Sequence, residues 1–208
     1  MNTPVLPEHS GLPGQVWLAS RSPRRLELLQ TLGLQVQVFL AQSSPEAEAL
    51  EAPFEHEDPL LYVQRVTQLK LNAALEAMRA QQFSGLVLAA DTTVALNGNI
   101  LGKPENAAQA FQMLQSLSNT IHEVHTAVAG AWLSNNGRTL AAQNTVQTSH
   151  VEFAPLPETF IHAYIASGEP FDKAGAYGIQ GIAGQYVRHI SGSHSGIMGL
   201  PLFETSEL

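Results

Sequence analysis

Cysteine is absent from this sequence. The absence excludes a disulfide-stabilised scaffold, a zinc site built from thiolates and a cysteine nucleophile. Long apolar runs are absent too. The longest, "LVLAA", is far shorter than the roughly 20 residues that a helix needs to cross a bilayer. These absences predict a soluble intracellular protein with no membrane partner.

Charge is scarce as well, at 13% of the residues, and the net charge is −8 with only ten lysines and arginines. A protein that binds a polynucleotide normally presents a basic face, so DNA and RNA are disfavoured partners. Several common motifs are also missing. The sequence has no dinucleotide-binding fingerprint between a strand and a helix, no P-loop lysine motif and no G-x-S-x-G elbow.

The first 14 residues, "MNTPVLPEHSGLPG", contain three prolines but no lysine, no arginine and no apolar run. This composition is typical of a disordered tail and not of a signal peptide, which favours a cytoplasmic location. Residues 15–208 show no internal repeat and no low-complexity linker, so we expect them to form a single α/β domain.

Apolar patterns and turn residues predict a mixed, twisted β-sheet flanked by helices. Ser22 as cap, Pro23 at the first position and Gly33 as the stop define a first helix. Asp58 starts a long helix that ends near Ala80, after a loop over 41–58. The other predicted elements are strands over 15–20, 85–91, 122–134, 138–153 and 186–190, a hairpin around Asn97-Gly98, and helices over 105–117, from Pro157 to Gly168 and from Pro201.

Two arginines, Arg24 and Arg25, fall in the first turn of the first predicted helix. A helix N-terminus carries positive partial charge and favours anions by about 0.3–1 kcal/mol per charge. Cations there are unfavourable unless an anion binds between them, so the pattern indicates a phosphate site. The alternative is that both side chains extend into water. Similarly, Lys70 lies on the apolar stripe of the long helix, where it either binds an anion or extends to solvent.

Asp91 ends the apolar run "GLVLAAD". Ligands of α/β sheets bind outside the carboxyl ends of the strands, so an aspartate there is a candidate functional residue. The alternative is an aspartate that only caps the strand. Lys103 and Lys173, each taken alone, are ordinary solvated loop lysines. Together with the two arginines and Lys70, however, they would suit a polyphosphate ligand.

The "HEVH" segment does not fit the zinc-protease motif. His122 and His125 are three residues apart on a predicted strand, where the motif needs two histidines four apart on a helix. Their side chains should therefore face opposite sides of the sheet, and we expect structural or supporting roles for both.

Five segments resemble one known family when read in order. They are "SRSPRRLELL", "AADTTV", "ILGKP", "GEPFDKAGAYGIQG" and "GLPL", and the likeness runs from Val16 to the C-terminus. Together they resemble the Maf family of nucleoside triphosphate pyrophosphatases. The resemblance implies an elongated sheet with two lobes around a central cleft, similar to inosine triphosphate pyrophosphatases.

The resemblance also implies residue roles. Asp91 matches the catalytic carboxylate, which accepts a proton from the attacking water. The positions that match the family's phosphate-binding residues are Ser20, Ser22, Arg25, Lys70 and Lys103. Those that match the family's base-selecting residues are Arg24, Thr92 and Gln180, and this set is of the dTTP/UTP type.

A divalent cation, Mg²⁺, Mn²⁺ or Co²⁺, is implied as cofactor and would be held by Asp91 and an acidic loop residue. The loop "SSPEAEALE" departs from the family pattern. Glu46 is the candidate ligand there, with Glu48 close behind. Family members are often dimers, so the resemblance admits a homodimer, although no apolar stripe identifies an interface.

The implied reaction is hydrolysis of dTTP and UTP, and of modified pyrimidine nucleotides, to the monophosphate and pyrophosphate. The alternative is a regulator of cell division and septum formation that binds nucleotides without hydrolysing them. The nucleotide is the expected small-molecule partner in both cases. Asp91 beside the cations favours the enzyme, because binding alone does not require a carboxylate there.

Overall fold

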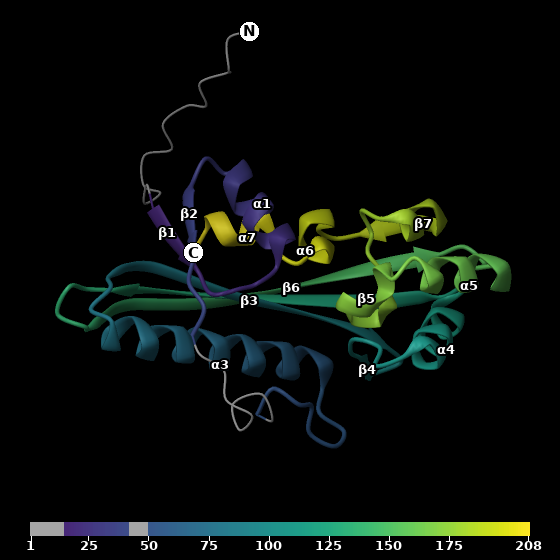
Figure 1. Ribbon diagram of the computed structural model, residues 1–208, viewed down its shortest axis with the longest axis horizontal. Helices are drawn as coiled ribbons and strands as arrows, with labels where there is room; N and C mark the ends of the chain where they lie inside the picture. Colours follow the sequence, from purple (N-terminus) through teal and green to yellow (C-terminus); the bar gives the residue numbers. More distant parts are fainter. Residues whose placement is uncertain (1–14, 42–49) are drawn as a thin grey trace, which may run out of the picture.

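The computed structural model describes residues 15–41 and 50–208, which form one mixed seven-stranded sheet with helices on both faces (Figure 1). The strand order is β2-β1-β3-β5-β6-β7, and β4 pairs with β3 off this path. The strands are β1 (Gln15–Leu18), β2 (Gln35–Val38), β3 (Gly85–Leu96), β4 (Asn99–Leu101), β5 (Ile121–Leu133), β6 (Thr139–Phe153) and β7 (Val187–Ser191). The helices are α1 (Pro23–Thr31), α3 (Pro59–Ala80), α4 (Ala107–Leu117), α5 (Glu158–Ala166), α6 (His194–Met198) and α7 (Leu202–Ser206). The predicted fold class is confirmed.

The N-terminal unit β1-α1-β2 is a parallel crossover, in which β1 pairs in parallel with both β2 and β3. α1 begins at Pro23 after the cap position Ser22, as predicted, but the Ser22 side chain makes no capping hydrogen bond. β1 ends at Leu18, earlier than the predicted residue 20. Ser20 and Ser22 therefore lie in the turn that leads from the strand into the helix.

β3 does not end at Asp91, so this part of the sequence-based prediction is wrong. The strand continues to Leu96 because β5 pairs with it along nearly its whole length. On the other edge, β3 pairs with β1 over Leu86–Leu88 and with β4 over Val94–Leu96. On this edge, no strand of the described ranges pairs with the stretch between them, residues 89–93, which we call the β3 gap. Asp91 is at the centre of this gap.

α3 and the two hairpins agree with the sequence. The Asp58 carboxylate accepts hydrogen bonds from the N–H groups of Leu60 and Leu61 and caps α3. Asn97 and Gly98 both have positive φ angles, of 51° and 77°, as a type I′ turn between β3 and β4 requires. The β5-β6 hairpin turns over residues 134–138, again as predicted.

The hydrophobic core divides into regions on either side of the β3 gap. One cluster lies under α4 and α5 and includes Val94. Two others flank the first part of β3. Val87 and Ala89 pack with α3 on one face, whereas Leu88 and Ala90 pack with α1 on the other. This alternation places the Asp91 side chain on the α3 face and that of the next residue on the α1 face.

The C-terminal segment differs most from the prediction. A short helix, α6, precedes the predicted last helix and was not expected, and α7 covers only Leu202–Ser206.

Across the described ranges, no helix combines the length and the apolar character needed to cross a bilayer.

Candidate active site

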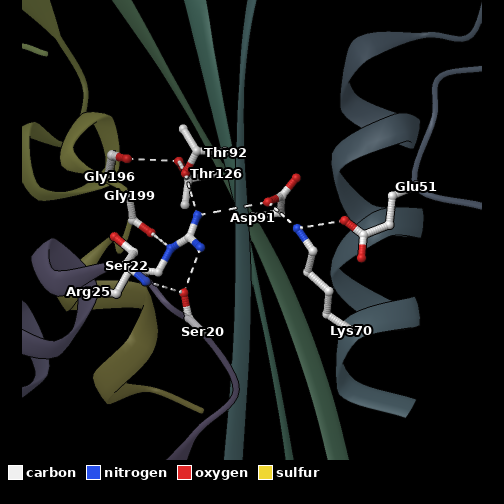
Figure 2. A network of polar contacts seen from close by, with 10 residues as sticks. All are labelled: Ser20, Ser22, Arg25, Glu51, Lys70, Asp91, Thr92, Thr126, Gly196 and Gly199. Carbon is white, nitrogen blue, oxygen red and sulfur yellow. Dashed lines mark hydrogen bonds and ion pairs between the residues drawn. The ribbon is translucent and has the colours of Figure 1, made fainter. Parts of the chain in front are cut away.

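Asp91 is approached by two cations from opposite faces of the sheet (Figure 2). Lys70, on α3, places Nζ 2.7 Å from Asp91 Oδ1. Arg25, on α1, places Nη2 4.0 Å from the same oxygen. Both side chains reach the carboxylate at the β3 gap, where no neighbouring strand stands in the way. Of the five cations expected to gather, the structure brings these two together at Asp91.

The Arg25 guanidinium is held by neutral oxygens of three different segments. Nε donates to the Gly199 carbonyl at 2.8 Å, Nη1 to Ser20 Oγ at 3.1 Å and Nη2 to Thr92 Oγ1 at 3.3 Å. Only 12% of the side chain is exposed. Burial lowers the pKa of Arg25 from its ordinary value, and the charge of Asp91 acts in the opposite direction. The group remains a cation, since arginine does not deprotonate in proteins.

The hydroxyl groups around Arg25 form a connected network. Thr92 Oγ1 lies 2.9 Å from Thr126 Oγ1, which donates to the Gly196 carbonyl of α6 at 2.8 Å. Ser20 Oγ also accepts from the Ser22 N–H at 3.2 Å. The network joins β3, β5, α6 and the β1-α1 turn (Figure 2). The unpredicted helix α6 is therefore part of the support of the site.

Lys70 does not extend into solvent, because its ammonium group is shared by two carboxylates. Besides Asp91, Glu51 Oε2 lies 3.2 Å from Nζ. Glu51 was missed by the sequence analysis, which named Glu46 and Glu48 from the same acidic segment. Those two residues lie outside the described ranges. The only signal was the run of glutamates itself, which does not distinguish one position from the next.

A second charged group joins α1 to the glycine-rich segment. Arg24 Nη1 lies 3.2 Å from Asp172 Oδ2, and Lys173 Nζ binds both Asp172 Oδ1 and the Glu169 carbonyl. Burial opposes ionisation of Asp172, but the hydrogen bonds and charges of Lys173 and Arg24 outweigh it and lower the pKa of the carboxyl. The Lys173 side chain is only 11% exposed, so its interpretation as a solvated loop lysine was wrong.

Gln180 and Lys103 are exposed, and within the described residues neither makes a side-chain hydrogen bond or an ion pair. Both lie on backbone that is tied to the glycine-rich segment. Lys103 follows Gly102, whose carbonyl accepts from the Gly175 N–H at 3.0 Å. Their side chains are available for a ligand, but the structure does not place them at Asp91.

The glycine-rich segment folds into short 3₁₀ helices, η1 (Glu169–Asp172), η2 (Ala174–Ala176) and η3 (Ile182–Tyr186). A Cβ at Gly181 would displace the Glu169 carboxylate from its position. The Tyr164 hydroxyl holds the segment in place. It donates to Glu169 Oε1 at 2.9 Å and accepts from the Gly178 N–H at 3.2 Å. The segment that carries Gln180 is thereby anchored from within the core.

The two histidines of "HEVH" lie on β5 with different surroundings, as their spacing predicted. His122 is buried, and its Nε2 lies 2.7 Å from the Tyr177 hydroxyl. Burial lowers the pKa of His122 to about 4, so it is neutral near pH 7. His125 Nδ1 lies 2.9 Å from Thr148 Oγ1. Both contacts are those of residues that support the sheet and the glycine-rich segment.

The family model and the sequence relatives give a consistent result. The family model described as Maf-like protein matches residues 15–208. A dTTP/UTP pyrophosphatase of Albidiferax ferrireducens is 48% identical over 194 residues, covering 93% of this chain and 94% of that protein. One of Polaromonas is 50% identical over 194 residues, with 93% of each chain covered. Among solved structures, a nucleoside-triphosphatase / dITP/XTP pyrophosphatase of Mycobacterium abscessus is 15% identical with a TM-score of 0.39, covering 69% of this chain and 76% of that one. On the family model and the extent of these sequence matches, the chain belongs to the Maf family.

Proposed function

We propose that this protein is a nucleoside triphosphate pyrophosphatase that hydrolyses dTTP and UTP, and modified pyrimidine nucleotides, to the monophosphate and pyrophosphate. Relatives that match nearly the whole chain carry the name dTTP/UTP pyrophosphatase. The observation that carries the proposal is the meeting of Lys70 and Arg25 at Asp91 in the β3 gap. A carboxylate flanked by two cations can accept a proton beside a bound polyphosphate.

In this mechanism Asp91 is the general base. The oxygen of a water molecule bonds to the α-phosphorus, and the bond from that phosphorus to the oxygen bridging toward the β-phosphate breaks. Pyrophosphate leaves with the bridging oxygen, and Asp91 accepts a proton of the water. Fixed charges at the reacting phosphate supply most of the stabilisation in such displacements.

The phosphate chain is assigned to Lys70, Arg25, Lys103 and the turn that contains Ser20 and Ser22. Arg25 uses three of its N–H donors on protein oxygens, and a guanidinium has about five, so donors remain for an anion. Lys70 can exchange a carboxylate partner for a phosphate oxygen. This turn also opens α1, whose N-terminus favours negative charge.

Base selection is assigned to Arg24, Thr92 and Gln180. Uracil and thymine present an acceptor at O4 beside a donor at N3, and the Gln180 amide can match both. Arg24 is held near the glycine-rich segment through Asp172. Thr92 already bonds Arg25 and Thr126, so we assign it an indirect part, through the position of Arg25.

A divalent cation fits the carboxylates of this site. Glu51 and Asp91 approach one point from two sides, the position of Lys70 Nζ. Mg²⁺ in proteins is commonly held by one or two carboxylates together with substrate phosphates. The described residues contain no group of three or more metal-ligating side chains. Glu51 and Asp91 would hold Mg²⁺, Mn²⁺ or Co²⁺, and the bound ion would shield phosphate charge.

A cytoplasmic location and a homodimeric assembly extend the proposal. The first follows from the substrate, because nucleoside triphosphates are found inside the cell. The second rests on the family resemblance alone, and a measurement of the mass in solution tests it.

The direct experiment measures pyrophosphate release from dTTP, UTP, CTP and GTP with Mg²⁺ or Mn²⁺. We expect release from dTTP and UTP and much less from GTP, and release slower by about 10²–10⁴-fold from the Asp91→Asn variant purified in parallel. Binding of dTTP without release from any triphosphate would instead support the regulator. The variant also controls for a contaminating phosphatase.

A further inference from the structure

Arg65 organises the segment that carries Glu51. It lies on α3 about two turns after the cap residue Asp58 and makes four hydrogen bonds to residues 50–57. Nη1 donates to the Leu50 carbonyl at 2.5 Å and Nη2 to the Ala52 carbonyl at 2.9 Å. Nε and Nη2 donate to the two carboxylate oxygens of Glu57 at 2.6 and 2.7 Å.

The two carbonyls that Arg65 binds belong to the residues on either side of Glu51. Fixing both of them fixes the backbone of the residue between them. The Glu51 carboxylate then reaches Lys70 Nζ at 3.2 Å, on the side away from Asp91 (Figure 2). Arg65 itself makes no hydrogen bond or ion pair to Lys70 or Asp91 in the described structure, so any influence on the site passes through Glu51.

The Arg65 guanidinium is held more firmly than most surface arginines. Exposed ion pairs contribute little in general, but this one is a two-point fork to a carboxylate that is only 10% exposed. The Phe54 ring centroid lies 4.1 Å from Cζ and that of Tyr62 lies 5.6 Å away. Glu57 Oε2 also accepts from the Phe54 N–H at 2.9 Å. Arg65, Glu57 and Phe54 therefore each contact the other two.

We propose that Arg65 is a positioning residue of the active site, which holds the backbone around Glu51 so that this carboxylate stands opposite Asp91 across Lys70. Arg65 does not touch substrate. The proposal rests on the proposed function in one respect, since it takes Glu51 and Lys70 to serve catalysis. It explains why an irregular, largely exposed segment presents a carboxylate at a defined place.

A double-mutant cycle on kcat tests the proposal. Residues that orient a ligating side chain typically contribute about 10–100-fold to activity. We expect Glu51→Gln and Arg65→Gln each to lower kcat by about this factor. We expect the double variant to be no slower than the slower single variant, because Arg65 acts only through Glu51. Independent losses that multiply, or an unchanged kcat in Arg65→Gln, would overturn the proposal.

Arg79 supplies the matched control. It lies near the other end of α3, where it binds the Gly137 carbonyl at 3.0 Å and Thr139 Oγ1 at 2.8 Å, and neither partner belongs to the site around Asp91. Arg79→Gln should lower the melting temperature about as much as Arg65→Gln but leave kcat unchanged. If Arg65→Gln does not fold, Glu57→Gln can replace it in the test, because it weakens the same anchor. Glu57→Gln should lower kcat in the wild-type background but cause no further loss of kcat in the Glu51→Gln background.

Hydrogen exchange separates this proposal from the proposed function. Amides of residues 50–57 should exchange faster in Arg65→Gln than in the wild type, with no change there in Arg79→Gln. Absence of pyrophosphate release by the wild type would refute the proposed function but leave this measurement intact. Unchanged exchange in Arg65→Gln would refute the anchor itself.

Discussion

Arg25 and Lys70 approach the same carboxylate but are held in different ways. Arg25 is 12% exposed and donates to three neutral oxygens, with the nearest carboxylate oxygen 4.0 Å away. Lys70 is 27% exposed and has two carboxylates within 3.2 Å. The guanidinium is fixed by its hydrogen bonds to the protein, whereas the ammonium group is a point charge on a flexible stem between two carboxylates. One position therefore supplies fixed geometry and the other supplies charge that can move to substrate.

Asp91→Asn tests the element that both cations share, and we expect it to have the largest effect. An amide keeps the shape but cannot accept the proton, so kcat should fall by about 10²–10⁴-fold, the usual contribution of a general base. Nucleotide binding should persist, since the cations remain. The measurements are kcat for dTTP and calorimetric binding of dTTP. If the variant keeps the wild-type kcat, Asp91 is a structural residue, and Arg25 and Lys70 do not flank a catalytic carboxylate.

Lys70→Ala tests the contribution of the ammonium group that lies between Asp91 and Glu51. Loss of a charge-assisted contact should lower kcat/KM by an amount that corresponds to about 1.5–3 kcal/mol of transition-state free energy. The variant should remain folded, because alanine suits the interior of α3 and Lys70 is not part of the hydrophobic core. Both are measured on the same preparation. If kcat/KM and melting are both unchanged, the lysine is only a surface group.

Arg25→Lys tests the built-in charge, and here we expect stability to change as well as activity. Lysine cannot reproduce the fork that reaches Ser20, Thr92 and the Gly199 carbonyl. A buried acceptor left without its donor costs about 1–3 kcal/mol in the free energy of unfolding. Urea unfolding measures this loss directly. Equal stability of Arg25→Lys and the wild type would remove the distinction between the two cations.

Gln180→Glu extends the comparison from the phosphates to the base, with the smallest expected effect. A carboxylate facing O4 opposes two acceptors, so kcat/KM for dTTP and UTP should fall by at least roughly tenfold, or about 1.4 kcal/mol. The control is GTP measured with the same variant. Survival of the pyrimidine preference would leave Arg24 and Thr92 as the residues that select the base.

Local signals in the sequence predicted most of the fold. The Asp58 cap, the Asn97-Gly98 turn and the β5-β6 hairpin each depend on a few neighbouring residues, and each is confirmed. The end of β3 was misplaced because an aspartate after an apolar run looks like a strand end. Pairing with β5, which is distant in sequence, extends the strand past it.

The site was predicted less completely than the fold. Lys70 could be found because its helical stripe points it inward, and the pairing with Asp91 bears this out. Glu51 could not be found, because Glu46, Glu48 and Glu51 look equivalent until Arg65 fixes the backbone of the last. The pairing of Arg24 with Asp172, 148 positions apart, likewise depends on tertiary contacts that no local pattern reveals.

The β3 gap has a further consequence, for association between molecules. Ala19 N–H donates to the Leu88 carbonyl, so by alternation the peptide groups of Ala90 and Thr92 face the same open edge. An unpaired strand edge is a template for pairing with another chain, and natural proteins protect such edges with charged side chains. At this edge the charged groups of Arg25, Lys70 and Asp91 lie together, and an incoming strand would have to pack its backbone against them. We therefore expect the charges of the active site also to disfavour strand-to-strand association at this edge.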